Sequence, residues 1–120
     1  MNRFIEDNNG KKITKGIKET ENKPELDLIP AEVILEMGKI LTLGKKKYPR
    51  RNWELGNDYG KYFGALQRHL WKWWNGENFD EETGENHLSH ALCCLSFLLT
   101  YQKRGIGNDD RPWKKLISKN

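Results

Sequence analysis

The sequence predicts an all-α protein: a small bundle of three main helices with polar N- and C-terminal extensions, completed by oligomerisation. Apolar residues recur at helical spacing in three stretches, and polar loops containing glycine separate those stretches. A chain of 120 residues is enough for one domain. Because the apolar residues gather between Ile29 and Tyr101, the core is small, and we expect a homo-oligomer to complete it.

The first predicted helix runs from Pro30 to about Leu43. Proline suits the first helical position, where its missing N–H costs nothing, and Glu32 is favourable in the positive first turn. Gly44 is a stop signal, and the lysines that follow complement the negative end of the helix. The apolar stripe of this helix consists of Val33, Met37, Ile40 and Leu41.

The second predicted helix spans about Asp58 to Asn75, with Asp58 as N-cap and Gly76 as its end. His69 lies within its apolar stripe, which consists of Tyr59, Tyr62, Phe63, Leu66, Leu70 and Trp73. We interpret its tryptophans as core or oligomer contacts rather than groups that stack on a substrate; they are Trp71, Trp73 and Trp74.

The third predicted helix, about Glu85 to Lys103, is expected to be central and most buried, because few polar residues interrupt it. Its stripe consists of Leu88, Leu92, Leu95 and Leu99, and its polar face of Ser89, Ser96, Thr100 and Lys103. Cys93 and Cys94 are adjacent on this helix, so they point in different directions and cannot form a disulfide with each other. Buried free thiols favour a reducing, cytoplasmic location.

The chain divides into a polar arm (1–22), a helical domain (23–104) and a C-terminal tail (105–120). Asn9-Gly10 would allow a loose hairpin with Phe4 and Ile5 facing Ile13, but we expect a mobile arm. Trp113 and Leu116 offer apolar side chains that could dock the tail on the body.

Charge and hydropathy narrow the class of protein. Lys and Arg number 21 against 17 Asp and Glu, a net charge of +4 with the signs interspersed. A nucleic-acid-binding protein usually carries a denser basic stripe, so we expect a small anionic ligand rather than nucleic acid. We see neither a signal segment nor an apolar stretch of about eighteen residues, so we expect no contact with a membrane.

The strongest candidate site is the segment 76–91, in which carboxylates precede two histidines spaced i, i+3 on one helix face. Carboxylate oxygen suits Mg²⁺, and imidazole nitrogen extends the choice to Mn²⁺ or other transition metals. A solvated acidic loop and core histidines bonded to backbone are the alternatives. Inward-facing His69, His87 and His90 beside acids are costly unless paired or coordinated, which favours a polar site.

A second candidate segment, 45–53, combines cationic side chains for phosphate with aromatic faces for a base. Without further context, a solvated basic loop whose aromatics pack on the core is the better interpretation of this segment. Arg68, one residue before His69, is placed either to contact phosphate or to pair with an acid.

These segments resemble the phage-borne dATP/dGTP diphosphohydrolase-like proteins, which look like distant relatives of the MazG-type all-α nucleoside triphosphate pyrophosphohydrolases. The resemblance covers about Lys23 to Tyr101. Its motifs are Lys23-Pro24…Leu28-Ile29-Pro30, Gly44-x-x-Lys47-Tyr48…Asn52-Trp53, Arg68-His69-Leu70 and Gly76-Glu77-x-x-Asp80-x-Glu82-x-Gly84-x-x-His87-Leu88-x-His90-Ala91.

The resemblance implies metal-dependent hydrolysis of a purine deoxynucleoside triphosphate to monophosphate and pyrophosphate, in the host cytoplasm if a phage encodes the chain. It implies Mg²⁺ or Mn²⁺ as cofactor. The catalytic candidates are Glu77, Asp80 and His87. The metal ligands would come from Glu77, Asp80, Glu82, His87 and His90. The nucleotide would contact Lys47, Tyr48, Arg51, Asn52, Trp53, Arg68 and His69.

One departure from the MazG-type pattern bears on the metal site. Those enzymes carry Glu-x-x-Glu on one helix and Glu-x-x-Asp on the next, whereas Glu32 and Glu36 here are four apart and the second helix has no such pair. The histidines would then replace those carboxylates. The alternative functions are a non-catalytic protein that binds or sequesters a nucleotide, and a small basic DNA- or partner-binding module.

Overall fold

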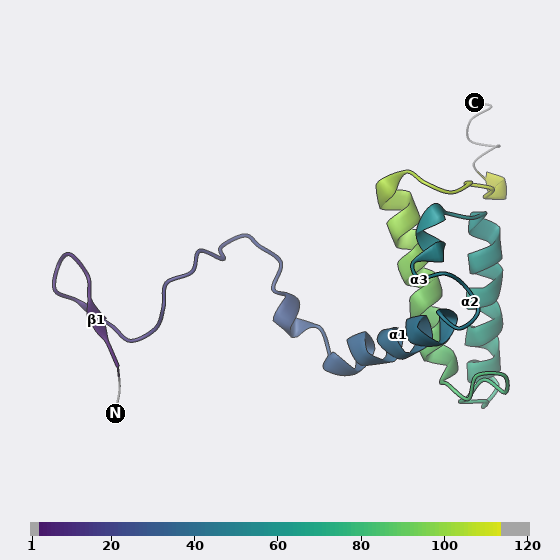
Figure 1. The fold of residues 1–120 in the computed structure, drawn as a ribbon, viewed down its shortest axis with the longest axis horizontal. Helices are drawn as coiled ribbons and strands as arrows, with labels where there is room; N and C mark the ends of the chain where they lie inside the picture. The colour runs from purple at the N-terminus through teal and green to yellow at the C-terminus, as the bar shows by residue number, and fades with distance from the viewer. Residues whose placement is uncertain (1–2, 114–120) are drawn as a thin grey trace.

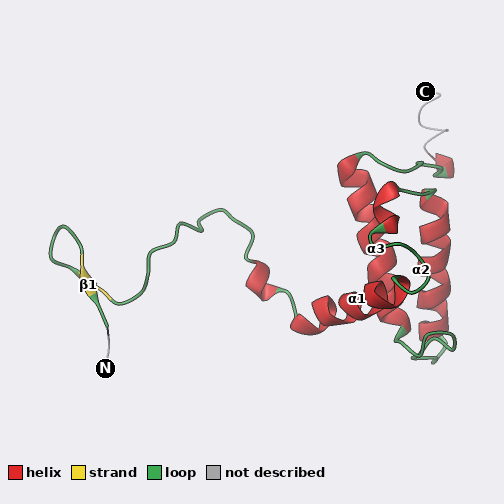
Figure 2. Cartoon of the chain, in the orientation of Figure 1, coloured by secondary structure: helices red, strands yellow, loops and turns green. Residues whose placement is uncertain are grey.

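A computed structural model describes residues 3–113, and three α-helices form the body of the molecule in that range (Figures 1 and 2). They are α1 (Ala31–Gly44), α2 (Tyr59–Trp74) and α3 (His87–Arg104). Two short 3-10 turns, η1 (Leu26–Leu28) and η2 (Asn52–Leu55), flank α1 and its following loop. The predicted all-α bundle of three main helices is confirmed, and its completion by oligomerisation stays a prediction.

The helix α3 lies at the centre of the body, as the sequence predicts. It packs along α2 on one side and is crossed by α1 on the other, and among the described elements α1 and α2 do not closely approach each other (Figure 1). Cys93 donates a hydrogen bond from Sγ to the Met37 carbonyl, 3.7 Å away, where α1 crosses. Most buried side chains therefore belong to α3.

The leucine stripe predicted to bury α3 is not the side that packs against α2. Leu95 and Leu99 are exposed, while the core contains Leu66 of α2 with Ala91 and Cys94 of α3. The reason is that α2 covers the side of α3 that carries Ala91 and Cys94. The side that carries Leu95 and Leu99 (the leucine side) stays exposed. Trp71, Trp73 and Trp74 are likewise exposed, so they are not core residues of this chain, and their alternative role as oligomer contacts stays a prediction.

A second cluster, made of aromatic rings, closes the far end of the bundle. Tyr101 is 0% exposed, packs against the rings of Tyr62 and Trp53, and donates a hydrogen bond to the Trp53 carbonyl at 2.5 Å. Trp53 in turn stacks on Phe97, with ring centroids 4.9 Å apart. Burial raises the pKa of the Tyr101 phenol, so it stays protonated and able to donate.

The segment after α3 contacts the start of α2. Asn108 donates its backbone N–H to the Asn57 carbonyl and accepts from the Tyr59 amide, at 3.1 and 3.0 Å. Gly107 (φ +80°) permits this approach, since a Cβ there would lie 2.7 Å from the Asn57 oxygen. Trp113 is exposed rather than docked. Leu116 lies outside the described residues.

The N-terminal arm carries the hairpin that the sequence allows. Strands β1 (Ile5–Glu6) and β2 (Lys12–Ile13) pair antiparallel with Ile5 opposite Ile13, across a turn that Asp7 stabilises by accepting the amides of Asn9 and Lys11. The arm leads away from the helices as far as Pro30 (Figure 1).

The three helices begin within two residues of the predicted positions, but the side chain at the N-cap of α2 does not cap the helix. Asp58 occupies the N-cap of α2, yet its side chain accepts from Asn108 Nδ2 at 3.1 Å instead of capping the helix. Asn86 caps α3, accepting from the Leu88 amide at 2.8 Å, which moves the predicted start from Glu85 to His87.

The two cysteines are buried and carry no disulfide, as predicted. Burial, with a smaller contribution from Cys94, raises the pKa of the Cys93 thiol to about 12, so it is protonated and unreactive at neutral pH. Within residues 3–113, every helix is too short or too polar to cross a membrane.

Candidate metal and phosphate site

The three histidines meet at one end of the α2–α3 pair. The first turn of α3 supplies His87 and His90, and α2 supplies His69 from its facing side. The His69 and His90 rings stack with centroids 4.6 Å apart and planes at 6°, and the His69 and His87 centroids lie 5.2 Å apart. His87 is 0% exposed. The convergence expected from the sequence is therefore present.

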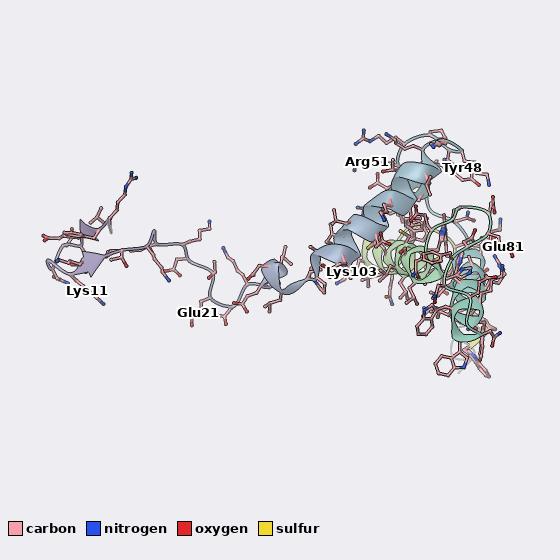
Figure 3. The ribbon with its side chains drawn as sticks, turned by 90° about the horizontal axis from the view of Figure 1, so that it is seen from below. Lys11, Glu21, Tyr48, Arg51, Glu81 and Lys103 are labelled. Carbon is pink, nitrogen blue, oxygen red and sulfur yellow. The ribbon has the colours of Figure 1, made fainter. Side chains whose placement is uncertain are left out.

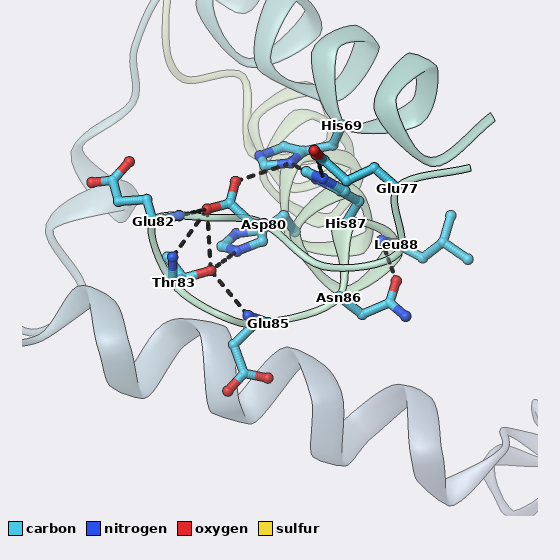
Figure 4. A network of polar contacts seen from close by, with 10 residues as sticks. His69, Glu77, Asp80, Glu82, Thr83, Glu85, Asn86, His87 and Leu88 are labelled. Atoms are coloured by element: carbon cyan, nitrogen blue, oxygen red, sulfur yellow. Dashed lines mark hydrogen bonds and ion pairs between the residues drawn. The ribbon is translucent and has the colours of Figure 1, made fainter. Parts of the chain in front are cut away.

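The acidic loop between the helices is held in one shape by its own hydrogen bonds (Figure 4). Asp80 Oδ1 accepts the amides of Glu82 and Thr83 at 2.8 and 3.0 Å, and the Asp80 backbone exchanges hydrogen bonds with Gly84 and Glu85. The His87 amide donates to the Asn78 carbonyl at 2.9 Å. These bonds fix the Asp80 carboxylate above the histidines, with Oδ2 3.9 Å from His69 Nδ1.

His69, Asp80 and His87 form a donor group of the kind that holds a divalent metal ion. One ligand atom from each lies within 4.8 Å of the other two, and His69 Nδ1 is 2.9 Å from His87 Nδ1. Two ligands at adjacent corners of an octahedron around an ion with bonds of about 2.1 Å are about 3 Å apart. The mixed nitrogen and oxygen donors suit Mn²⁺ and similar ions, so the residues present fit such an ion.

Glu77 contacts His87 from the side opposite this group. Its Oε2 lies 2.5 Å from His87 Nε2, whereas His87 Nδ1 faces His69. When Nε2 carries the proton and donates it to Glu77, Nδ1 presents its lone pair to the donor group. Carboxylates commonly fix the orientation and tautomer of metal-binding histidines in this way. Glu77 is therefore placed to orient His87, a different position from the direct ligation predicted for it.

His90 also supports the group from outside it. Its Nε2 bonds Thr83 Oγ1 at 2.7 Å, and its ring covers His69. Thr83 was not among the predicted site residues, because a lone threonine in an acidic loop carries no signal in the sequence. Its hydroxyl also accepts the Glu85 amide at 3.2 Å, so it connects the loop to His90.

The surroundings of the group keep the His69 imidazole neutral. Burial lowers the pKa of His69 to about 4, with help from His90 and His87 and against the pull of Asp80. Burial opposes ionisation of Asp80, but amide hydrogen bonds from Thr83 and Glu82 and the nearby histidines lower its pKa overall. At neutral pH the His69 imidazole is thus neutral and the Asp80 carboxylate ionised, the protonation states that bind a metal ion.

Two of the residues predicted to contact nucleotide lie against the acidic loop: His69, within the donor group, and Lys47. Lys47 Nζ lies 3.4 Å from Glu82 Oε1, and both side chains are solvent-exposed. Glu82 therefore faces Lys47, and it is outside the donor group. Tyr48, on the same loop as Lys47, is exposed, and Figure 3 shows Tyr48 and Arg51 at the end of the body where α1 finishes.

Other predicted contacts lie farther from the histidines. Trp53 packs on Phe97, ten residues along α3 from His87, or about 15 Å of helix. Arg51 lies 3.8 Å from Glu54, and Asn52 begins η2 beside it. The Arg68 guanidinium extends along α2 towards Gly64 rather than towards Asp80. Their assignment to the nucleotide stays a prediction.

Glu36 is a further acid near the site that the prediction leaves out. Its Oε1 accepts a hydrogen bond from Ser89 Oγ at 3.1 Å, so Ser89 is buried under α1 instead of lying on a polar face. The position of Glu36 in the sequence could have indicated this role. Glu36 follows Val33 by three residues and precedes Met37 by one, so it is a charged residue among the inward-facing positions of α1.

Residues 14–111 match a family described as dATP/dGTP diphosphohydrolase, N-terminal. The match contains the acidic loop, all three histidines and the loop formed by residues 45–53, which carries Lys47 and is called the lysine loop below. The chain belongs to this family. The resemblance seen in the sequence motifs is thereby confirmed.

The chain is also similar to a curated protein of Salmonella phage PMBT28, which is named dATP/dGTP diphosphohydrolase. It is 31% identical over 102 residues, which are 85% of this chain and 35% of the relative. The chain thus spans about a third of the length of that relative. No solved structure is similar to the chain.

Proposed function

We propose that this member of the family hydrolyses dATP or dGTP to the monophosphate and pyrophosphate with the help of a divalent cation. The observation that carries the proposal is the convergence of His69, Asp80 and His87 within 4.8 Å of one another. The name of the phage relative, dATP/dGTP diphosphohydrolase, supports the choice of substrate. The expected reaction is attack by water on the α-phosphorus with release of pyrophosphate.

The cation would be held by His69, Asp80 and His87, where it would neutralise phosphate charge and make a bound water more acidic. Glu77 orients His87 through the contact at Nε2. Asp80 belongs to the donor group and Glu77 contacts its member His87, so these two carboxylates are the candidates for accepting the proton of the attacking water.

Phosphate binding is assigned to the lysine loop. Lys47 contacts Glu82 of the acidic loop, and both side chains are exposed, so its ammonium lies on the solvent face of that loop. A triphosphate that approaches from solvent can exchange this exposed ion pair for a contact of its own, since such pairs contribute little to stability. Tyr48 offers an exposed ring beside it on which a purine could stack.

Incubation of the purified chain with each of the four common dNTPs and Mg²⁺ or Mn²⁺ tests the proposal. We expect pyrophosphate from dATP or dGTP, slower release from pyrimidine nucleotides, and complete loss in excess EDTA. Thermal stabilisation by a nucleotide that is recovered intact would instead identify a non-catalytic binding protein. Turnover that survives removal of all divalent ions would reject the role of the donor group.

A further inference from the structure

The N-terminal arm reaches away from the body without packing on it. Neither the hairpin nor η1 closely approaches a helix, and the described chain extends 63 Å along its longest axis (Figure 1). In the second view, Lys11 and Glu21 again lie well apart from the helices (Figure 3). The family match nevertheless begins at residue 14, so the arm from there to Pro30 is part of the pattern that the family shares.

This arm carries apolar side chains that its own body does not cover. Leu28 is 74% exposed, and Ile17, Leu26 and Ile29 are exposed as well. Pro30 restricts the residue before it, and Ile29 is extended (φ −73°, ψ 128°), so the chain leaves α1 in a fixed direction. A segment of this composition gains stability when a surface takes up its leucines and isoleucines.

The body offers such a surface on the leucine side of α3. A groove of about 760 Å³ runs between α2, α3 and the segment after α3, and its surface is mostly apolar. Phe63, Leu95 and Leu99 line it, each about half exposed, together with Leu98, Pro112 and Trp113. Contiguous exposed apolar surface of this kind marks an interaction site in a soluble protein.

The size of the core supports a partner of the same sequence. Only five apolar residues are buried among those that the structure describes: Leu66, Ala91, Cys93, Cys94 and Tyr101. A domain this small has little stability to spare, and association is a common way to complete such a core. Each copy would have an arm whose apolar side chains are exposed and an apolar groove on α3 that its own arm does not fill.

We infer that the arm of one copy, residues 14–29, docks into the groove of a second copy, and that the exchange is reciprocal. Fully extended, these residues span up to about 55 Å, longer than the 44 Å width of the molecule, so the arm can cross from its own body to a neighbour. A reciprocal exchange closes with two-fold symmetry and leaves no unused arm or groove, which limits assembly to a dimer.

Light scattering or sedimentation of the full chain over a range of concentrations tests the inference. We expect a dimer for the native sequence. Leu28→Asp on the arm and Leu99→Asp in the groove should each weaken the dimer at least about tenfold, because each puts a carboxylate into the apolar contact. The matched control is Leu55→Asp, which alters a leucine 81% exposed, outside both the arm and the groove, and should leave the dimer intact.

Mixing the two variants separates this arrangement from other dimers. The Leu99→Asp copy keeps a native arm and the Leu28→Asp copy a native groove, so a heterodimer restores one of the two native arm–groove contacts. We expect it to form, more weakly than the native dimer, at concentrations at which each variant alone is monomeric. A monomer at every concentration, a dimer insensitive to Leu28→Asp, or a mixture that stays monomeric would each overturn the inference. Leu28 contacts no helix, so its substitution cannot act by unfolding the body. The readout is mass, independent of any hydrolysis.

Discussion

Asp80→Asn is expected to lower pyrophosphate release by at least about 100-fold. Asparagine keeps an oxygen that can accept the Glu82 and Thr83 amides, so the loop should retain its shape. It loses the carboxylate charge 3.9 Å from His69 Nδ1. Loss of partners that merely orient ligands costs about 10–100-fold in metal affinity or activity, and loss of a ligand should cost more.

The control for Asp80→Asn is Glu81→Gln, the neighbouring position on the same loop. Glu81 is exposed and outside the donor group, so removing its charge tests the acidity of the loop without changing the group. Steady-state rates at saturating Mn²⁺ and unfolding curves for both proteins complete the comparison. Equal losses in the two variants would show that general negative charge, rather than the Asp80 carboxylate, matters.

Tyr101→Ala is expected to cost about 3–5 kcal/mol of the free energy of unfolding, the usual range for deleting a buried aromatic side chain. The ring is fully buried between α2 and η2, and its hydroxyl satisfies the Trp53 carbonyl. Tyr101→Phe should cost less, about 1–3 kcal/mol, because it removes only the donor of that hydrogen bond.

Urea denaturation measures both effects, and Tyr48→Ala is the matched control. Tyr48 is exposed, so the same substitution there should change stability by no more than about 0.5 kcal/mol. If Tyr101→Ala were as mild as Tyr48→Ala, the aromatic cluster would not hold η2 against α3, and the account of the far end of the bundle would be wrong.

Helical periodicity was sufficient to place α1, α2 and α3, because each stripe repeats over three or more turns. It was not sufficient to orient α3. Leu95 and Leu99 make a better apolar stripe than Ala91 and Cys94, yet the helix packs by the smaller residues, which allow α2 to approach, and leaves the leucines to the groove. Such a choice depends on what covers each face, and periodicity in one chain does not contain that information.

The sequence predicts which residues form the candidate site better than it predicts how their atoms contact one another. The spacing of His87 and His90 and the inward position of His69 indicated that the imidazoles converge. Which nitrogen faces Glu77, and that His90 bonds Thr83, depend on how the loop folds back on itself through Asp80. Those loop hydrogen bonds join residues with no periodic pattern, so they could not be predicted from the residue types alone.

We propose above that His69, Asp80 and His87 hold a divalent cation. Titration of the full chain with Mn²⁺, followed by the paramagnetic resonance of the free ion, measures this directly. We predict one site per chain whose affinity falls at least about tenfold in both His69→Gln and Asp80→Asn and is unchanged in Glu81→Gln. Binding that is absent from the native protein, or equally strong in all three variants, would contradict the claim.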